Sequence, residues 1–183
     1  ALQLPEQGDP LSRKWGEQLR REHDDPAKVV AALLQHFNRE PYGYTLKPPP
    51  LGQSSVDGFL FNTRQGFCAH YAGAMVFVLR AAGIPARVVA GYQGGELNAE
   101  ENYLSVRQLD AHAWVEYWSV GNGWISVDPT FQVAPERINA GAQEAFAADE
   151  GFLENSPFSP LRYRDVGWIN HLRLAWDDIN YSW

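Results

Sequence analysis

The sequence predicts an α+β domain in which a buried helix packs against an antiparallel sheet. Two observations carry this prediction. Residues 67–80 place apolar side chains at the i, i+3, i+4, i+7 spacing of a helix face. Segments typical of strands, joined by turn residues, then follow between residues 86 and 128. Since no internal repeat or second core is evident, the 183 residues are expected to form a single domain, 1–183.

Two amphipathic helices are expected ahead of the buried one. The first has an apolar residue at every fourth position between residues 11 and 19. The second begins at Asp25-Pro26, where an acidic cap is followed by proline in the first turn, and ends before Pro41. Residues 41–55 are rich in proline and are expected to form an extended surface connection.

The buried helix is expected to stop at Gly83, and the sheet to follow. Gly121-Asn122-Gly123 is a strong hairpin signal between two of the predicted strands. The predicted strands are residues 86–92, 103–107, 112–120 and 124–128, with a loop at 94–100. Beyond residue 151 the pattern weakens, and a last helix is predicted at 166–183.

Cys68 is the only cysteine, so it cannot form an internal disulfide. It is either a small buried hydrophobic residue or a reactive thiol. His112 follows 44 residues later in a predicted strand, and Asp128 a further 16 residues later at the end of another strand. Each residue alone is most often structural. Together they supply a nucleophile, a base and an orienting acid, the groups needed for thiol acyl transfer.

The local settings of these three residues suit that chemistry. A helix that begins at Cys68 offers free N–H groups and about half a unit of positive charge, both of which stabilise a thiolate. The main-chain N–H of Cys68 is placed to donate a hydrogen bond to an oxyanion. If the hairpin pairs symmetrically about Asn122, Asp128 would face Glu116, with His112 about four residues further along. The strands therefore allow the two side chains to lie close together.

Composition excludes several other classes of protein. A net charge of −7 leaves no basic surface for nucleic acid. No run of about 18 apolar residues could span a membrane. No histidine and cysteine cluster suggests a metal site, and no glycine-rich loop suggests a nucleotide, so neither metal nor cofactor is predicted. The start at Ala1 resembles neither a signal peptide nor a natural beginning, which suggests a piece of a longer protein.

Four segments in order resemble the transglutaminase-like superfamily, in particular its bacterial membrane-anchored members. The matching block covers residues 59–130. The segments are Gly66-Phe67-Cys68-Ala69-His70-Tyr71-Ala72, the stretch 79–92 that contains Gly83-Ile84-Pro85-Ala86-Arg87, Asp110-Ala111-His112-Ala113-Trp114-Val115-Glu116, and Gly123-Trp124-Ile125-Ser126-Val127-Asp128-Pro129-Thr130.

The resemblance implies a papain-like fold, with a cysteine-bearing helix on an antiparallel sheet. By position, it makes Cys68 the nucleophile, His112 the base and Asp128 the orienting acid. It also implies a parent protein in the bacterial inner membrane whose soluble domain lies in the periplasm, with residues 151–183 leading toward a membrane anchor. Family members use an aromatic residue upstream of the cysteine to bind the oxyanion, and Tyr44 is the candidate here. Some need calcium, but no calcium loop is evident in this sequence.

The predicted function is that of a protein-glutamine gamma-glutamyltransferase, which joins a glutamine acyl group to a primary amine through a thioester. Its partners would be a protein or peptide glutamine donor and an amine acceptor. Trp114 and Trp124 are predicted to line the substrate site. A cysteine peptidase or amidase acting on periplasmic or cell-wall peptides is the alternative, and a non-catalytic binding module is the second. The oligomeric state is left open.

Overall fold

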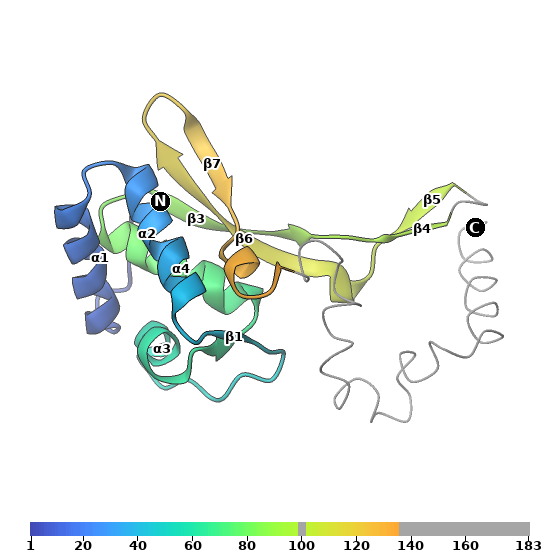
Figure 1. The fold of residues 1–183 in the computed structure, drawn as a ribbon, viewed down its shortest axis with the longest axis horizontal. Coiled ribbons are helices and arrows are strands. Elements are labelled where there is room, and N and C mark those ends of the chain that lie inside the picture. Colours follow the sequence, from blue (N-terminus) through green and yellow to red (C-terminus); the bar gives the residue numbers. More distant parts are fainter. Residues whose placement is uncertain (99–101, 136–183) are drawn as a thin grey trace. The chain divides into compact units, whose positions relative to one another are not determined.

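A three-stranded antiparallel sheet and the helix that packs on it form the centre of the fold (Figure 1). The computed structural model describes residues 1–98 and 102–135, all within the unit Ala1–Ala145. Helices α1 (Pro10–Glu22) and α2 (Pro26–Arg39) precede the central helix α4 (Cys68–Ala81), which packs on the sheet. The predicted α+β class, with a cysteine-bearing helix on an antiparallel sheet, is confirmed.

The helix ends follow the cap chemistry expected from the sequence. The Asp25 carboxylate accepts a hydrogen bond from the Ala27 N–H at 2.9 Å, and Pro26 occupies the first turn of α2. Helix α4 stops before Gly83, whose φ of +73° suits glycine. The Ile84 N–H then closes the end by donating to the Leu79 carbonyl at 2.9 Å.

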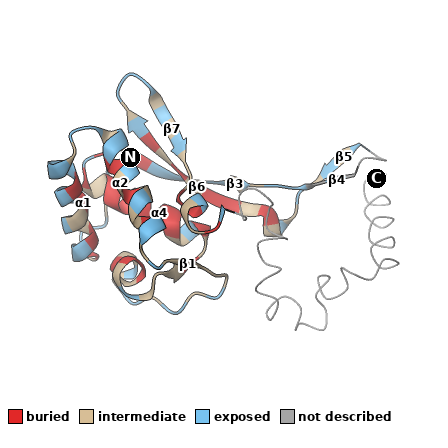
Figure 2. Ribbon diagram, viewed as in Figure 1, coloured by how far each residue is buried: buried red, intermediate tan, exposed pale blue. Residues whose placement is uncertain are grey.

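Helix α4 is buried along most of its length (Figure 2). Its apolar side chains point both toward the sheet and toward helices α1 and α2, so it lies at the middle of the hydrophobic core. Fully buried side chains gathered there include Phe37, Phe59, Tyr71, Met75, Leu79 and Val115. Because both sides of the helix are packed, its first residue, Cys68, has a well-defined position relative to the sheet.

The sheet has the order β3-β6-β7, from strands β3 (Ala86–Tyr92), β6 (Ala111–Ser119) and β7 (Gly123–Val127). The prediction that residues 103–107 add a strand to it is wrong. Strand β5 (Tyr103–Ser105) instead pairs with β4 (Glu96–Asn98), which lies in the predicted loop. Strand β6 pairs with β3 through Ala111–Tyr117 and with β7 through Val115–Ser119, and β5 joins neither edge.

The register of the β6–β7 hairpin differs from the symmetric pairing expected about Asn122. Ser119 pairs with Gly123, so the loop holds residues 120–122 and is centred on Gly121. Gly121 and Gly123 have φ values of +87° and +77°, which a longer loop with glycine can adopt. Continuing the register places Asp128 opposite Trp114 rather than Glu116.

The segment 41–55, predicted to be an extended surface connection, contains one short strand. Strand β1 (Gly43–Tyr44) lies parallel to β2 (Gln65–Gly66), with the Thr45 N–H donating to the Gly66 carbonyl at 2.8 Å. Between them lie a short helix α3 (Ser55–Asp57) and a π-helical turn (Gly58–Thr63). Since β2 leads directly into α4, this pairing brings β1 beside the start of the central helix.

The predicted helix at 166–183 and the segment 151–183 lie outside the described residues. Within residues 1–98 and 102–135, no helix is long and apolar enough to cross a membrane.

Replacing Tyr71 with Phe should loosen β1 from helix α4. The fully buried Tyr71 hydroxyl donates to the Gly43 carbonyl at 2.7 Å, so its loss leaves that carbonyl without this partner. We expect the free energy of unfolding to fall by about 1–2 kcal/mol in urea titrations. Tyr92→Phe, at a side chain 58% exposed, is the matched control and should change it by less than about 0.5 kcal/mol. Equal losses in both variants would contradict this role for Tyr71.

Candidate active site

Cys68 is the first residue of helix α4, and the chain before it is shaped to begin a helix there. Phe67 is extended, and its N–H donates to the His70 Nδ1 at 3.3 Å, a capping contact that turns His70 back onto the helix start. A Cβ on Gly66 would lie 2.8 Å from the Cβ of His70, so glycine leaves room for this turn. The thiol is therefore held at the positive end of a helix.

His112 reaches the site from β6 and Asp128 from the end of β7. Nε2 of His112 lies 2.6 Å from Oδ2 of Asp128, and the imidazole side chain is fully buried. The observed register accounts for this contact: Asp128 follows Val127, the partner of Val115, and so reaches the same face of β6 as His112. The hairpin thus brings together the two residues that were predicted to act as base and acid.

The other oxygen of Asp128 is used in the main chain. Oδ1 accepts a hydrogen bond from the Thr130 N–H at 2.9 Å, as Pro129 starts a short 3₁₀ turn (Pro129–Gln132). This contact caps the turn and orients the carboxylate. The carboxylate therefore cannot rotate away from His112 without breaking the cap.

The imidazole of His112 connects the carboxylate to the thiol. Its second nitrogen, Nδ1, is buried and makes no well-formed hydrogen bond within the described residues, sulfur acceptors included, so it is the nitrogen that remains available to the thiol of Cys68. Burial alone would lower the pKa of His112, but the hydrogen bond with Asp128, the nearby thiol of Cys68 and the negative charges of both raise it to about 9. At neutral pH the imidazole is therefore protonated.

The pKa of the Cys68 thiol shifts in the opposite direction to that of His112. Burial alone would raise the pKa of Cys68, but hydrogen bonds from His112, from the main chain of Ala113 and from the side chain of Tyr44, with the charge of His112, lower it overall. The sequence predicted Cys68, His112 and Tyr44 at one site, and the structure brings all three together. The geometry favours a thiolate beside an imidazolium.

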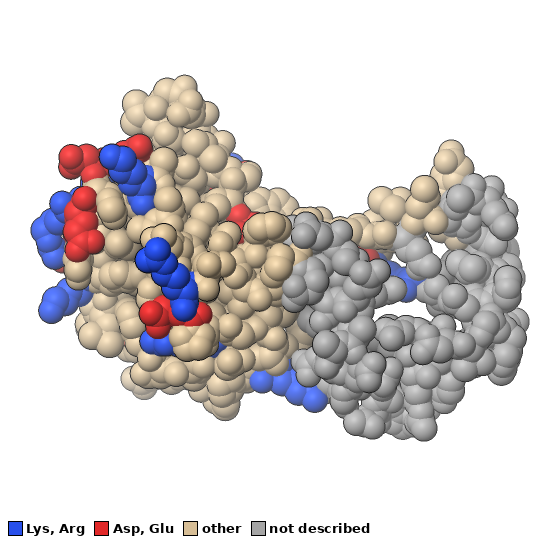
Figure 3. Space-filling model, viewed as in Figure 1, with Lys and Arg blue, Asp and Glu red and all other residues tan. Residues whose placement is uncertain are grey.

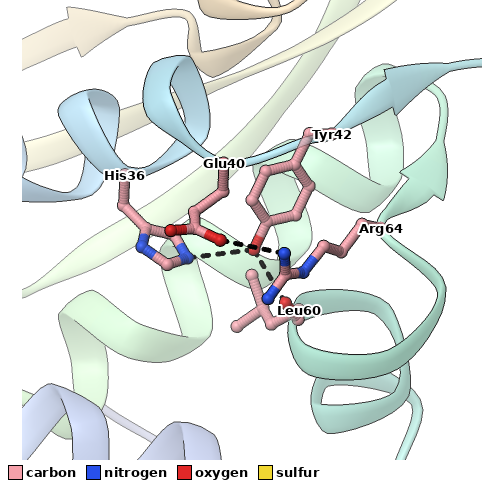
Figure 4. A network of polar contacts seen from close by, with 5 residues as sticks. All are labelled: His36, Glu40, Tyr42, Leu60 and Arg64. Atoms are coloured by element: carbon pink, nitrogen blue, oxygen red, sulfur yellow. Dashed lines mark hydrogen bonds and ion pairs between the residues drawn. The ribbon is translucent and has the colours of Figure 1, made fainter.

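A polar network around Tyr42 anchors the chain two residues before Tyr44. The Tyr42 hydroxyl donates to the Leu60 carbonyl at 2.8 Å and lies 3.2 Å from Nε2 of His36, while Arg64 pairs with Glu40 at 2.9 Å (Figure 4). These contacts join α2, the segment before β1 and the π-helical turn. The ring of Tyr44 also stacks on Tyr71, at 6.4 Å and 7°. The position of Tyr44 is therefore set by its surroundings.

Trp114 lies beside the imidazole, two residues along β6. The two rings are nearly parallel, with centroids 6.3 Å apart and an interplanar angle of 20°. On the neighbouring strand, Gly91 pairs with His112, and a Cβ there would lie 2.8 Å from the end of the indole. Glycine at this position gives the indole space beside the imidazole of His112.

Trp124, also predicted to line the substrate site, lies elsewhere. It pairs with Trp118 across the hairpin, six residues from His112 along β6, or about 20 Å. Its ring contacts the ring of Trp118 at 5.6 Å, and the Arg87 guanidinium at 4.2 Å. In Figure 3 charged side chains gather over α1 and α2, while the hairpin tip carries none. The structure does not bring Trp124 to the thiol.

Sequence reasoning missed the main-chain donors of this site. The Ala113 and Thr130 N–H groups have no signature in side-chain identity, although the Asp-Pro-Thr order of the second is an observable signal. Gly91 was also missed, because its role depends on the cross-strand position of Trp114. Among the residues that the structure describes, no cluster of three or more His, Cys, Asp or Glu side chains could hold a metal ion.

Comparison with known families identifies the class of protein. The family model described as "Transglutaminase-like superfamily" matches residues 13–129, so the chain belongs to this family. A solved structure, the periplasmic domain of TgpA from Pseudomonas aeruginosa, matches with a TM-score of 0.77 and 67% identity, over 78% of this chain and 50% of that one. The resemblance seen in the sequence and the expected core fold are confirmed.

Individual relatives place the chain within the family. A "Protein-glutamine gamma-glutamyltransferase" of Pseudomonas aeruginosa is 64% identical over 182 residues, covering all of this chain and 27% of the relative. "Uncharacterized protein YebA" of Bacillus subtilis is 34% identical over 70% of this chain and 18% of its own length. The human "Protein-glutamine gamma-glutamyltransferase 4" is 27% identical over 76% of this chain. The chain thus spans about a quarter of the length of its bacterial transferase relative.

The alkylation of Cys68 by iodoacetamide should depend on pH as expected for an ion pair. A lowered thiol pKa and a His112 pKa of about 9 keep the thiolate in place across neutral pH. We therefore expect the wild-type rate to hold to a lower pH than that of an ordinary thiol. In His112→Ala the rate should instead follow an ordinary thiol with a pKa of about 8.5 and fall roughly tenfold per pH unit below it.

His23→Ala, which removes an imidazole after helix α1, is the control and should keep the wild-type profile. A wild-type rate that already falls tenfold per unit between pH 8 and 6 would contradict the ion pair.

Proposed function

We propose that this chain is the acyl-transfer domain of a transglutaminase, with Cys68 as nucleophile, His112 as acid and base, and Asp128 as orienting acid. The observation that carries the proposal is the position of His112, held by Asp128 at 2.6 Å on one nitrogen and open to Cys68 on the other. The name of the relative that is 64% identical supports transfer from protein glutamine.

In the first half of the reaction the Cys68 thiolate attacks the carboxamide carbon of a glutamine side chain, forming the C–S bond. The N–H of Cys68, at the free end of helix α4, and the hydroxyl of Tyr44 donate to the developing oxyanion. His112 passes the Nδ1 proton to the leaving nitrogen, the C–N bond breaks, and ammonia departs. A thioester on Cys68 and a neutral imidazole remain.

In the second half a primary amine attacks the thioester. His112 takes a proton from the amine, the C–S bond breaks, and the thiolate leaves beside a restored imidazolium. Asp128 keeps the Nε2 proton in place throughout and stabilises the charged ring. Water can attack in place of the amine and would yield glutamate, so exclusion of water by Trp114 favours transfer.

The proposed substrates are a glutamine-bearing protein or peptide as donor and a primary amine as acceptor. The match to a solved domain described as periplasmic supports a periplasmic location for this chain as well. Its attachment to a membrane-anchored parent protein is part of the proposal and rests on the sequence resemblance alone. The contact of Trp114 with the His112 ring supports a role for Trp114 in binding substrate near the reacting atoms, and no such contact among the described residues supports Trp124.

Incubation with a glutamine-rich protein and a biotinylated primary amine tests the proposal by mass spectrometry. We expect amine to be incorporated at glutamine, and Cys68→Ala to lower incorporation by a factor of about 10³ or more because the nucleophile is lost. Tyr44→Phe should lower it about tenfold to a hundredfold, as one oxyanion donor is removed.

The products distinguish the competing functions. Deamidation or peptide cleavage without incorporation, lost in Cys68→Ala, would replace transfer with hydrolysis. Incorporation that survives in Cys68→Ala would contradict the assignment of the nucleophile. If every Cys68-dependent product is absent across donors that carry accessible glutamine, the domain is a binding module.

A further inference from the structure

We propose that the main-chain N–H of Thr130 restricts position 128 to a carboxylate, because it occupies one oxygen and leaves the other for His112. An asparagine at this position would fix the imidazole in the tautomer that cannot serve Cys68. The inference rests on the proposed function and adds a positioning group to it.

Both oxygens of Asp128 are engaged by N–H donors on opposite sides. Oδ1 accepts from Thr130 at 2.9 Å and Oδ2 from Nε2 of His112 at 2.6 Å. An ionised carboxylate has two accepting oxygens and no proton to donate, so it satisfies both neighbours at once. A side-chain amide has one accepting oxygen and one NH₂ group, so it can satisfy only one of them.

The Thr130 N–H cannot easily give up its acceptor. Thr130 is fully buried, and its carbonyl accepts from the Ala134 N–H at 2.8 Å and the Val133 N–H at 3.1 Å. The 3₁₀ turn that contains it packs against α2 and α4. Leaving this N–H without a partner would cost about 1–3 kcal/mol. The oxygen of an asparagine would therefore be drawn to Thr130.

The consequence falls on His112. With the amide oxygen at Thr130, the NH₂ group faces Nε2, which must then accept rather than donate. A neutral imidazole in this arrangement carries its proton on Nδ1 and cannot accept one from the thiol. An imidazolium carries protons on both nitrogens and would meet the NH₂ group donor to donor. Both effects remove the stabilisation of the thiolate at Cys68.

The chain contains a matched reference for this geometry. Asp25-Pro26-Ala27 forms the same cap as Asp128-Pro129-Thr130: the carboxylate accepts from the N–H two residues later at 2.9 Å, and proline starts the helix. Asp25 is exposed and far along the chain from the thiol. Asparagine caps a helix as well as aspartate does. Asp25→Asn therefore measures the effect of replacing a capping carboxylate with an amide where no histidine is involved.

The test is the pH dependence of Cys68 alkylation by iodoacetamide in wild type, Asp25→Asn, Asp128→Asn and Asp128→Ala. We expect Asp25→Asn to keep the wild-type rate at pH 6 within about twofold. Asp128→Asn should react roughly 100-fold more slowly at pH 6 and follow an ordinary thiol titration, because the tautomer is wrong. Asp128→Ala leaves Nε2 free for water, and should react at least as fast as Asp128→Asn.

Two results would overturn different parts of the account. The inference is overturned if Asp128→Asn is alkylated at pH 6 at a third or more of the wild-type rate. It is also overturned if Asp128→Ala is alkylated more slowly than Asp128→Asn. In either case the proposed function still stands. A wild-type protein that itself titrates as an ordinary thiol overturns the proposed function, and the inference with it.

A second measurement does not depend on whether Asp128→Asn folds. In Cys68→Ala labelled with ¹⁵N-histidine, the neutral His112 ring should carry its proton on Nε2, facing Oδ2 of Asp128. A proton found on Nδ1 would show that Asp128 does not set the tautomer, and would overturn the inference by a route that does not use the thiol.

Discussion

The rest of the site depends on the hydrogen bond between Nε2 of His112 and Oδ2 of Asp128, which joins the two strands of the β6–β7 hairpin. It spans two strands, so it exists only in the register that pairs Val115 with Val127. A shift of one residue would turn Asp128 to the other face of the sheet. The glycines of the hairpin loop fix that register through their positive φ values. Loop conformation, strand pairing and the electrostatics of the imidazole are thus parts of one constraint.

The second requirement is that the thiol meets the other side of the same imidazole. Helix α4 supplies it, because packing against β6 on one side and against α1 and α2 on the other fixes the helix in place. The parallel pair β1–β2 then adds Tyr44 at the helix start. Three segments far apart in the sequence converge on one sulfur atom. The site is buried enough for charges to interact strongly, which is why the pKa of Cys68 falls and that of His112 rises.

Much of this arrangement is predictable from local chemistry. The Asp25-Pro26 cap and the end of α4 at Gly83 could each be identified from neighbouring residues in the sequence. Cys68, His112 and Asp128 became candidates only together, through their order and the family resemblance. The pairing partner of Asp128 could not be identified, since it depends on the number of loop residues in the hairpin, and an error of one loop position moves the partner by two residues. The short strand β1 depends on pairing with Gln65-Gly66, which is distant in sequence. Strand β5 pairs locally with β4 because β4 lies where a loop was predicted. Among the main-chain donors, the Ala113 N–H carries no side-chain signal, whereas the Thr130 N–H is indicated only by the Asp-Pro order before it.

The central claim is that Cys68 and His112 form an ion pair, with the thiol deprotonated and the imidazole protonated. Histidine NMR of the whole chain as a function of pH tests it most directly, by following the Cε1 proton of His112. The account predicts a pKa of about 9 in the wild type and a lower value in Cys68→Ala, because the negative charge of the thiolate is gone. A His112 that titrates near 6.5, with the same pKa in both proteins, would contradict the account.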